Sequence, residues 1–411
     1  MNVLLLGGAR QCHEGLRDIS QRIVLFTRKS AYAFNSYMAK ADLEFPYENV
    51  HLFADEEGVE DYVRLAKLLH AERPFDAICC FHDGYQEIAI NVAEVLAIDM
   101  KLSLETLRNI MDKDRARAVL RAAGLDSTEF MLVDTEQQLL TKAEQLGFPL
   151  VMKPHDATAS SGVSIIMNVA EVALAADYYR RSKGGYPAML ERFHEGPEFS
   201  VEGFSEGGVH RILAITRKYV HQSSRVEIGH VIPARLSVED EEQVKNYVID
   251  VIEALGITDG PTHTEIILTK DGPRFIETHT RGGGDYIWEL VRLSTGVNLT
   301  SITARQSVGE PVLDSVIASD SQAKSAAIWF LFPDEGVEGR LYDVTNVRAA
   351  EVLDGVYDVS ILKDRGEKVG PVQNSFDRIA KVIALSDDPD TAIEIAKAGS
   401  ALLRLQLMSE C

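Results

Sequence analysis

Two glutamates, Glu265 and Glu277, are spaced so that a β-hairpin would bring their carboxylates together. The segments 263–269 and 274–280 predict two strands around the turn Lys270-Asp271-Gly272, which sets residue 265 opposite residue 277. The two Cβ atoms would then lie roughly 5 Å apart on one face. Such carboxylates repel each other unless a cation lies between them, and Mg²⁺ is commonly held by one or two carboxylates plus substrate phosphates. The pair therefore predicts a magnesium site, with a solvated pair on an exposed sheet face as the alternative.

The segment after Glu277 combines a cation with bare backbone. Arg281 has a planar guanidinium suited to carboxylate or phosphate, and the three glycines at 282–284 remove side chains where a ligand must approach closely. The alternatives are a surface ion pair for the arginine and a flexible turn for the glycines. An acidic pair, an arginine and bare backbone within about twenty residues favour a binding site.

Two lysines are candidates for binding phosphate. Lys153 ends an apolar run, where a charge must emerge at the strand end or pair with an anion. The small, hydroxyl-rich loop 154–162 follows it and could act as a lid whose hydroxyl and N–H groups cover phosphates. Lys113 lies in the first turn of a predicted helix, where the dipole disfavours a cation unless an anion binds. For each lysine the alternative is a surface role. The candidates within the loop are Ser160, Ser161 and Gly162.

A linker between two predicted strands, 188–193 and 198–204, has features of a nucleotide site. Free backbone groups in such a linker can bind the edge of adenine, and Glu198 could accept hydrogen bonds from ribose hydroxyls. The sequence has no G-x-x-x-x-G-K-[ST] motif, which excludes a P-loop ATPase on motif grounds. The linker candidates are Glu191, Arg192, Phe193 and His194.

These candidates require a scaffold, and the hydrophobic pattern predicts an α/β one. Short apolar runs at 3–6, 23–26 and 77–81, with a helix over 59–70, are typical of a doubly wound parallel sheet. The C-terminal half mixes elements in an α+β manner and ends with a predicted helix over 391–405. We predict four segments: 1–110, 111–190, 191–310 and 311–411.

Composition narrows the classes of function. Of the 411 residues, 45% are hydrophobic and 26% are charged, and the formal net charge of −21 argues against a nucleic-acid groove or an anionic membrane surface. No stretch approaches the roughly 18 apolar residues of a membrane span, and the N-terminus predicts a strand instead of a signal peptide. The four cysteines lack metal-ligand spacing, which favours reduced thiols in a cytoplasmic protein. They are Cys12, Cys79, Cys80 and Cys411.

In their order along the chain, these motifs resemble the ATP-grasp superfamily over roughly residues 100 to 310. The resemblance implies an ATP-grasp fold preceded by the parallel-sheet domain. It also implies that Lys113 and Lys153 bind ATP phosphates, that the main chain around 191–194 binds adenine, and that Glu198 binds ribose. Mg²⁺ would lie on the acidic pair, with two ions expected and Mn²⁺ able to substitute. The matching motifs are Asp112-Lys113, Val151-Met152-Lys153-Pro154, the Glu191 linker, Gly196–Val201 and the pair Glu265 and Glu277.

Within that superfamily the chain is most similar to the L-amino-acid ligases that form dipeptides, the bacilysin and dapdiamide types. The segment 227–234, Arg281 and Gly284 carry this likeness. It implies that His230, Arg281 and Gly284 line the amino-acid and acyl-phosphate site, with His230 and Arg281 taking part in catalysis. Asp285 is a candidate contact for a cationic or amide-bearing substrate side chain.

Two positions depart from the family pattern. Many relatives have Asn where this chain has His279, so a role for His279 as a metal ligand stays open. The phosphate loop has Gly162 as its one glycine, where relatives often have several, so the loop depends more on its hydroxyl groups.

The activity that the resemblance implies is an ATP-dependent carboxylate–amine ligase. It would join two amino acids, or an amino-acid derivative and an amino acid, through an acyl phosphate, with release of ADP and phosphate. Such chemistry serves dipeptide or peptide-antibiotic biosynthesis, and small amino acids would be the partners of a cytoplasmic enzyme that could form a homodimer. Two alternatives stay open: an ATP-grasp carboxylase of the biotin-carboxylase type and a non-catalytic ATP-binding module.

Overall fold

The N-terminal part contains a parallel sheet in the order β3-β2-β1-β4. Helices α3 (Val59–Glu72) and α4 (Asp83–Leu96) cover one face, and η1 (Glu14–Leu16) and α11 (Leu299–Ser307) cover the other. Because both faces are buried, the strands are continuously apolar, and the predicted doubly wound sheet is confirmed. The strands are β1 (Asn2–Leu6), β2 (Arg22–Arg28), β3 (Asn49–Phe53) and β4 (Ala77–Cys80). The computed structural model describes residues 1–7, 13–32, 47–154, 162–182, 186–221, 224–316 and 323–408.

A small antiparallel sheet in the order β5-β8-β6-β7 forms the next part of the chain. Helices α7 (Glu136–Leu146) and α8 (Val172–Ser182) bury their apolar residues against one face of it. The edge strand β7 is the short strand that follows the loop after Lys153. The strands are β5 (Phe130–Val133), β6 (Leu150–Pro154), β7 (Ser164–Ile166) and β8 (Ala188–Arg192).

The centre of the molecule is a larger sheet whose strand order is β13-β12-β9-β10-β11-β14-β18-β16. The three strands after residue 310 continue the sheet of the preceding segment, because β14 pairs with β11. The segments 191–310 and 311–411 therefore share one hydrogen-bonded sheet. In chain order the strands are β9 (Glu198–Glu206), β10 (Val209–Val220), β11 (Glu227–Ile232), β12 (Gly260–Thr269), β13 (Gly272–His279), β14 (Ser325–Leu331), β16 (Val356–Ile361) and β18 (Ala380–Ser386).

Helices cover both faces of this large sheet. On one face, α5 (Leu104–Met111), α6 (Lys113–Ala122) and α9 (Val238–Leu255) pack against β9, β10, β12 and β13. Against the other face lies α10 (Ile287–Thr295), over β10, β11 and β14. The alternation of strand residues explains this, since Ile232 points to α10 and Val231 to the C-terminal helix.

The C-terminal helix is α13 (Pro389–Leu402), which is shorter than predicted. The pattern predicts a helix to residue 405, but Arg404 already begins strand β19 (Arg404–Leu407), which pairs with β15 (Gly339–Thr345). Tertiary pairing overrides the helical periodicity of the last residues. A third strand, β17 (Lys368–Val369), completes this small sheet beside α12 (Val347–Glu351).

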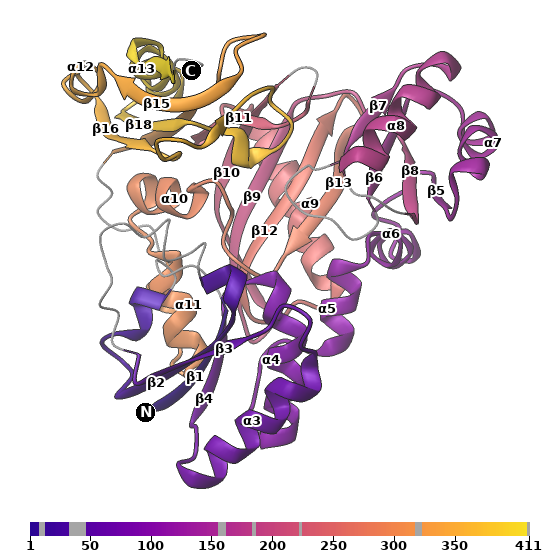
Figure 1. Cartoon of the computed structure of the whole chain (residues 1–411). Coiled ribbons are helices and arrows are strands. Elements are labelled where there is room, and N and C mark those ends of the chain that lie inside the picture. The colour runs from indigo at the N-terminus through magenta and orange to yellow at the C-terminus, as the bar shows by residue number, and fades with distance from the viewer. Residues whose placement is uncertain are drawn as a thin grey trace.

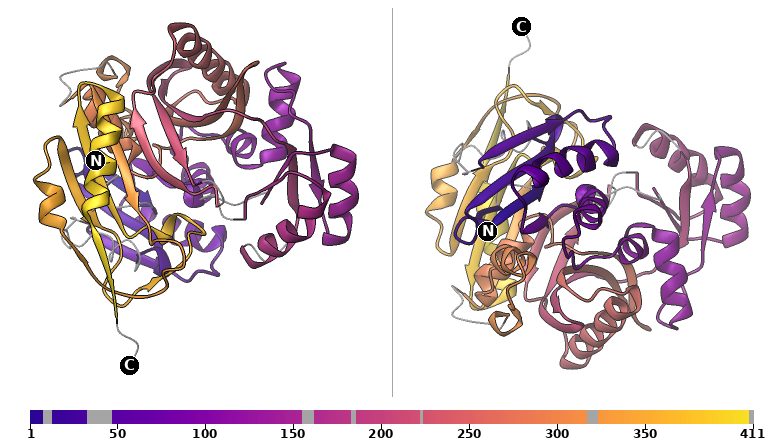
Figure 2. Two further views of the ribbon diagram at one scale, coloured as in Figure 1. Left: turned by 90° about the horizontal axis from the view of Figure 1, so that it is seen from above. Right: turned by 90° about the horizontal axis from the view of Figure 1, so that it is seen from below.

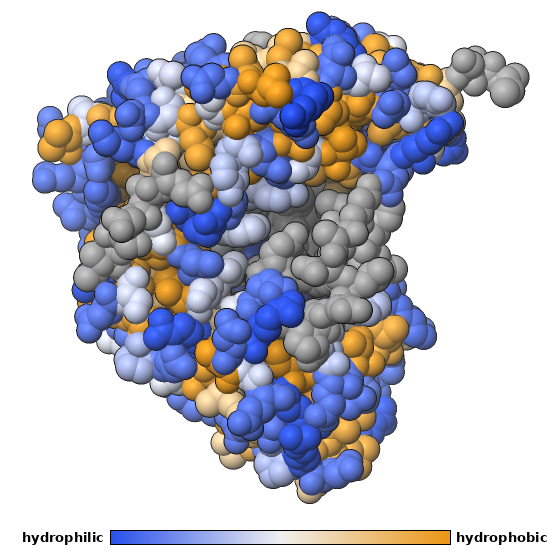
Figure 3. All heavy atoms as spheres, turned by 90° about the vertical axis from the view of Figure 1, so that its left-hand side faces the viewer, coloured by the Kyte–Doolittle hydropathy of each residue, from blue (hydrophilic) through white to orange (hydrophobic). Residues whose placement is uncertain are grey.

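Figure 1 shows the β1–β4 sheet below the large sheet, and β15, β16 and β18 at the top of the view. Figure 2, seen from above and below, places the β5–β8 sheet and its helices on the opposite side of the large sheet from the C-terminal elements. The face in Figure 3 is largely hydrophilic, with hydrophobic residues gathered near its upper edge. Among the described residues, no helix is both long enough and apolar enough to cross a membrane.

Candidate active site

The hairpin of β12 and β13 sets Glu265 directly opposite Glu277, as the sequence predicts. The register arises differently from the prediction, because Thr269 pairs with Gly272 across a two-residue turn. A bulge between Glu265 and Ile266 takes up one extra residue on β13 and restores the pairing of the two glutamates. The positive φ of 99° at Gly272 suits the tight turn. The bulge therefore decides that the two carboxylates face each other.

Basic side chains surround the two opposed carboxylates. Lys218 Nζ lies 2.6 Å from Glu265 and 3.3 Å from Glu227, while Lys113 Nζ lies 3.3 Å from Glu277. Burial would raise the pKa of both hairpin glutamates, but Lys218 and Lys113 respectively hold each pKa below its usual range. Both side chains are therefore ionised and able to accept a divalent cation.

Two oxygen ligands fit Mg²⁺ when phosphate and water complete its shell. Among the described residues, no cluster of three or more His, Cys, Asp or Glu side chains has the geometry of a metal site. The two carboxylates lie beside Lys113 and Lys218, which suits a metal that arrives with nucleotide phosphates. Glu265 and Glu277 would hold this metal.

Two histidines contact the carboxylates of Glu265 and Glu277. His279 has Nε2 at 3.2 Å from Glu277 and Nδ1 at 3.1 Å from Asp83, so both ring nitrogens already face carboxylates. Burial alone would lower the pKa of His279, but these two carboxylates raise it. His263 lies 2.9 Å from Glu202 and 3.3 Å from Glu265, and despite burial Glu202 raises the pKa of His263 to about 9. His279 therefore orients Glu277 instead of presenting a free nitrogen to a metal.

Arg281 is held by a residue from the other end of the chain. Its Nε donates to Asp83 Oδ2 at 2.6 Å, and one terminal nitrogen donates to the carbonyl of Gly282 at 2.9 Å. Asp83 begins α4, directly after strand β4 of the parallel sheet. Asp83 was not among the predicted site residues, although a carboxylate at the carboxyl end of a parallel strand lies where such sheets bind ligands.

The glycines after Arg281 have different roles. A Cβ on Gly283 would lie 2.8 Å from His263 Nδ1 and 3.0 Å from Glu202 Oε2, so the loop packs directly on that pair. A Cβ on Gly284 would meet no described atom within 4 Å. Gly283 is therefore needed by the protein itself, whereas Gly284 leaves room in the adjoining cavity.

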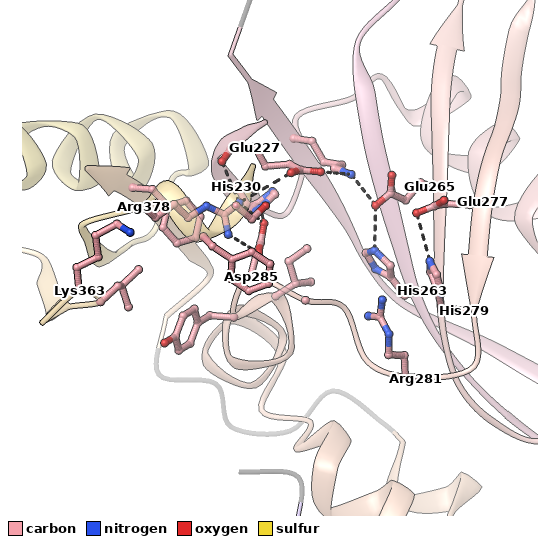
Figure 4. A pocket seen from close by; sticks show the side chains of 18 of the residues that line it. Glu227, His230, His263, Glu265, Glu277, His279, Arg281, Asp285, Lys363 and Arg378 are labelled. Atoms are coloured by element: carbon pink, nitrogen blue, oxygen red, sulfur yellow. Dashed lines mark hydrogen bonds and ion pairs between the residues drawn. The ribbon is translucent and has the colours of Figure 1, made fainter. Parts of the chain in front are cut away.

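A cavity of about 550 Å³ joins the acidic pair to the C-terminal part of the chain. Figure 4 shows its labelled side chains, with Glu265, Glu277 and Arg281 at one end and Lys363 and Arg378 at the other. The C-terminal wall was not predicted from the sequence, because its residues begin more than fifty positions after the acidic pair and have no motif of their own. That wall comprises Phe330, Leu362, Lys363, Glu367, Ser375, Phe376 and Arg378.

Asp285 and His230 meet Arg378 at the wall of this cavity. Two nitrogens of Arg378 lie 2.5 Å from the two oxygens of Asp285, and His230 Nε2 lies 3.2 Å from the same carboxylate. Burial would raise the pKa of Asp285, but Arg378 lowers it far below its usual range. Asp285 lines the cavity but is already paired with Arg378, so its contact with a cationic or amide-bearing substrate side chain stays a prediction.

Lys153, one of the two lysines predicted to bind phosphate, lies in a network of buried charged side chains. Lys153 Nζ is 2.5 Å from Glu191, which also accepts from Arg117 Nε at 2.7 Å, and Arg117 contacts Asp126 at 2.7 Å. Burial lowers the pKa of Lys153, and the nearby cations Arg117 and Lys113 lower it further, although Glu191 opposes this. An anion such as a phosphate would favour the charged lysine. Arg117 was missed, although a charge on the apolar side of α6 was a usable signal.

More backbone N–H groups of the linker after β8 are already hydrogen-bonded within the protein than predicted. Glu191 lies in the sheet between β5 and β6, so its side chain, and not its main chain, faces the charge network. The N–H groups of Arg192 and Phe193 donate to Glu129 and Pro149, which removes two donors from the expected adenine contact. The binding of adenine by the main chain of this linker therefore stays a prediction, with two of its N–H groups already hydrogen-bonded.

The remaining nucleotide candidates lie near the same linker. His194 Nε2 is 2.9 Å from the hydroxyl of Thr128, and the Glu198 carboxylate forms an ion pair with Arg225. Gly162 has a positive φ of 76° at the end of the phosphate loop. Two further candidates, Ser160 and Ser161, and most of the predicted lid 154–162 lie outside the described residues, as do Cys12 and Cys411.

Comparison with known proteins agrees with this geometry. Residues 146–288 match the ATP-grasp domain family, and residues 329–408 match the family of the L-amino acid ligase C-terminal domain 2. The alanine–anticapsin ligase of Bacillus subtilis (strain 168) is 25% identical over 287 residues, which are 62% of this chain and 58% of that protein. The chain matches 59% and 58% of the lengths of two curated relatives, less than two thirds of each.

Two solved structures share the fold. The L-amino acid ligase from Bacillus licheniformis aligns with a TM-score of 0.83 at 21% identity and covers 99% of each chain. The biotin carboxylase domain of the Hydrogenobacter thermophilus 2-oxoglutarate carboxylase, in complex with MgADP, ADP and bicarbonate, aligns at 0.69 with 15% identity, over 98% of this chain and 90% of that one.

Residues 146–288, which include the hairpin that carries the acidic pair, form an ATP-grasp domain. The C-terminal part matches the L-amino acid ligase C-terminal domain, so the resemblance predicted from sequence is confirmed.

Proposed function

We propose that the protein is an ATP-dependent ligase that joins the carboxylate of one amino acid, or amino-acid derivative, to the amine of another. One observation carries the proposal: the pair Glu265 and Glu277 shares a cavity with Arg281 and with a wall from the L-amino acid ligase C-terminal domain. The alanine–anticapsin ligase supports it as a relative, and dipeptide or peptide-antibiotic synthesis is the corresponding role.

ATP would bind beside the cavity, where Lys113, Lys153 and Arg117 lie close together. A bound Mg²⁺ would neutralise phosphate charge between Glu265 and Glu277. The lysines hold the phosphoryl oxygens, and little covalent chemistry is required of the protein beyond positioning and electrostatics. MgADP in the related carboxylase domain supports this choice of cofactor.

The reaction has two balanced steps. A carboxylate oxygen of the first amino acid bonds to the γ-phosphorus, the bond to ADP breaks, and an acyl phosphate forms. The second amino acid's amine bonds to the acyl carbon, phosphate leaves with the former carboxylate oxygen, and the amine loses a proton. Arg281, fixed by Asp83, is placed to stabilise charge on the acyl phosphate and on the tetrahedral intermediate.

Water must be excluded because an acyl phosphate hydrolyses readily. The C-terminal wall contributes Phe330, Leu362 and Phe376, which line the cavity with apolar surface. His230 lines the cavity, is 1% exposed, and contacts Asp285 through Nε2. We therefore assign it a place against the substrate, at the inner wall of the cavity.

A biotin-carboxylase-type reaction is the second candidate. A bicarbonate ion needs far less space than the cavity of about 550 Å³, and the cavity wall comes from the L-amino acid ligase C-terminal domain. Both observations favour two amino-acid substrates. A non-catalytic ATP-binding module is disfavoured because the carboxylates, lysines and arginine of the site are all in place.

The test is a pairwise screen of amino acids with ATP and Mg²⁺, followed by ADP release and mass spectrometry of the products. We expect a dipeptide mass and one ADP per bond formed. Glu277→Gln should lower turnover by roughly 10²-fold or more because an electrostatic group at the transferring phosphoryl is removed. Glu105→Gln, an exposed site on α5, is the matched control.

Three outcomes would contradict the proposal: no substrate-dependent ADP with any mixture, a strict requirement for bicarbonate, or full activity in the Glu277→Gln variant. Retention of the melting temperature in that variant would show that a loss of turnover does not come from unfolding.

A further inference from the structure

Lys363 provides a cation at the far end of the cavity that adjoins the acidic pair. It follows β16 in the C-terminal part of the chain, lines the cavity and is half-buried. Figure 4 shows it at the end of the cavity remote from Glu265 and Glu277. The preceding Leu362 donates its N–H to the carbonyl of Ile379 at 2.8 Å, which fixes the backbone here beside β18. The proposed chemistry at the acidic pair gives this end of the cavity no role.

The ammonium of Lys363 differs from the other lysine and arginine side chains of the cavity in having no ion-pair partner. Among the described residues, no carboxylate lies within ion-pair distance of it. An anion can bind there without first breaking an ion pair of the protein, and partial burial strengthens the contact. The other lysine and arginines that line the cavity already contact carboxylates: Lys218 contacts Glu265 at 2.6 Å, Arg281 contacts Asp83 at 2.6 Å and Arg378 contacts Asp285 at 2.5 Å.

Ser375 adds a neutral donor on the same wall. It begins the short 3₁₀ helix η4 (Ser375–Asp377) and lines the cavity. Its hydroxyl forms no hydrogen bond with the part of the chain that the structure describes, so it can donate to a ligand. Glu367, a carboxylate on this wall, accepts the N–H of Asp364. An ammonium and a hydroxyl on one wall together suit a carboxylate group.

Apolar side chains line the same cavity. They belong to Tyr286, Phe330, Leu362 and Phe376. The volume of about 550 Å³ leaves room for a ligand larger than one small amino acid. The hydrocarbon part of an amino-acid substrate therefore fits the apolar surface, while a carboxylate at its end fits the cation.

We propose that Lys363 and Ser375 bind a carboxylate of an amino-acid substrate, other than the carboxylate that reacts with ATP. The inference rests on the proposed function, because that function supplies amino acids as the occupants of the cavity. Two groups have the required chemistry: the side-chain carboxylate of an acidic amino acid and the α-carboxylate of the amino acid that provides the amine. Probes that lack one or the other distinguish them.

The test is calorimetric titration of the full chain, with ADP and Mg²⁺ present, using L-glutamate, L-glutamine and L-isoglutamine. L-glutamate has both carboxylates, L-glutamine has only the α-carboxylate, and L-isoglutamine has only the side-chain carboxylate. Lys363→Met should weaken the binding of L-glutamate about tenfold or more, as expected from the loss of a charge-assisted contact. Lys363→Arg retains the positive charge and should recover most of this affinity.

The other two probes identify the carboxylate that is bound. Weaker binding of L-isoglutamine to Lys363→Met, with unchanged L-glutamine, assigns the contact to the side chain, and the reverse result assigns it to the α-carboxylate. Ser375→Ala should weaken binding of the same probe, because a hydrogen bond to a charged group is lost.

The matched control is Lys368→Met, which removes an exposed lysine of β17 that is not among the residues lining the cavity. It should leave the affinity for all three probes unchanged. Unchanged affinity for all three in Lys363→Met, equal weakening in Lys368→Met, or no saturable binding to the native protein would overturn the inference. Melting temperatures of the variants show whether each protein stays folded.

Kinetics separate this inference from the proposed function. With a pair of amino acids that is ligated, Lys363→Met should raise the KM of the substrate that makes the contact about tenfold or more. The value of kcat should change little, because the contact is the same in the ground state and in the transition state. Binding through Lys363 in a protein that forms no ADP with any pair would overturn the proposed function and leave the carboxylate site standing.

Discussion

Arg378 binds both carboxylate oxygens of Asp285 at 2.5 Å, across a sequence separation of 93 residues. The guanidinium also lies over the ring of Phe330, 3.9 Å from its centroid, and donates to the carbonyl of Glu227 at 2.9 Å. The C-terminal part of the chain is thereby joined to Asp285, four residues after Arg281, at the wall of the cavity.

Removing one partner of this pair should destabilise the protein more than removing both. We expect Arg378→Met to lower the free energy of unfolding by roughly 3 kcal/mol, because it leaves a largely buried carboxylate without its partner. The double variant Asp285→Asn with Arg378→Met should lose less than the sum of the single changes. Urea unfolding of all four proteins measures the coupling, with the exposed Arg348→Met as control. Additivity within about 0.5 kcal/mol would contradict a coupled pair.

The glycines at 283 and 284 should respond differently to the same added methyl group. Gly283→Ala would push the segment away from His263 and Glu202, and we expect a loss of about 10² in kcat/KM, because a shift near 1 Å costs about that much. Gly284→Ala has space for its methyl group and should fold normally, with its effect limited to the KM of the amino acid. Steady-state kinetics and melting temperatures of both variants decide this. Equal effects on kcat would argue against the packing role of Gly283.

The contribution of the network around Glu191 to the stability of the protein should depend on pH. Burial would raise the pKa of Glu191, but Arg117 and Lys153 lower it to about 2, below the usual value near 4.3 for an unfolded chain. A lowered carboxyl pKa stabilises the folded state above the unfolded pKa, and this stability disappears as pH falls from about 4.5 toward 2. Glu191→Gln should be less stable at pH 7 yet lose less stability between pH 5 and 3. Urea midpoints across this range test it, and parallel pH curves for the two proteins would count against it.

Lys153 should affect ATP more than the amino acids. Lys153→Met removes a cation from the proposed phosphate site, and we expect the KM for ATP to rise about tenfold or more, since charge-assisted contacts to phosphate are strong. Lys153→Arg should recover part of the affinity. Lys397→Met on α13 is the control, because that lysine lies on a different part of the surface. An unchanged affinity for ADP by calorimetry would remove Lys153 from the nucleotide site.

Local sequence patterns were sufficient to predict much of the fold. The buried strands at the N-terminus and the helices α3, α6 and α9 could be predicted because their apolar periodicity is a property of a few neighbouring residues. The end of α13 could not be predicted in this way, because the pairing of β19 with β15 decides whether residues 404 and 405 are helical.

Contacts between distant segments account for what sequence reasoning missed. Asp83 reaches Arg281 over 198 residues, and Arg117 reaches Glu191 over 74. No periodicity links such positions, so a carboxylate after a strand or a cation in a helix gives only a weak signal.

The sequence by itself indicated a hairpin that brings Glu265 and Glu277 together, because pairing across a short turn is a local property, and it showed that lysines, Arg281 and glycines accompany this pair. The tertiary structure decided what those residues contact. It placed His279 between Asp83 and Glu277, joined Arg378 to Asp285, and used a bulge to keep the two glutamates opposed. The physical reason is that packing and ion pairing between segments depend on the whole fold, whereas hairpin pairing depends on about fifteen consecutive residues.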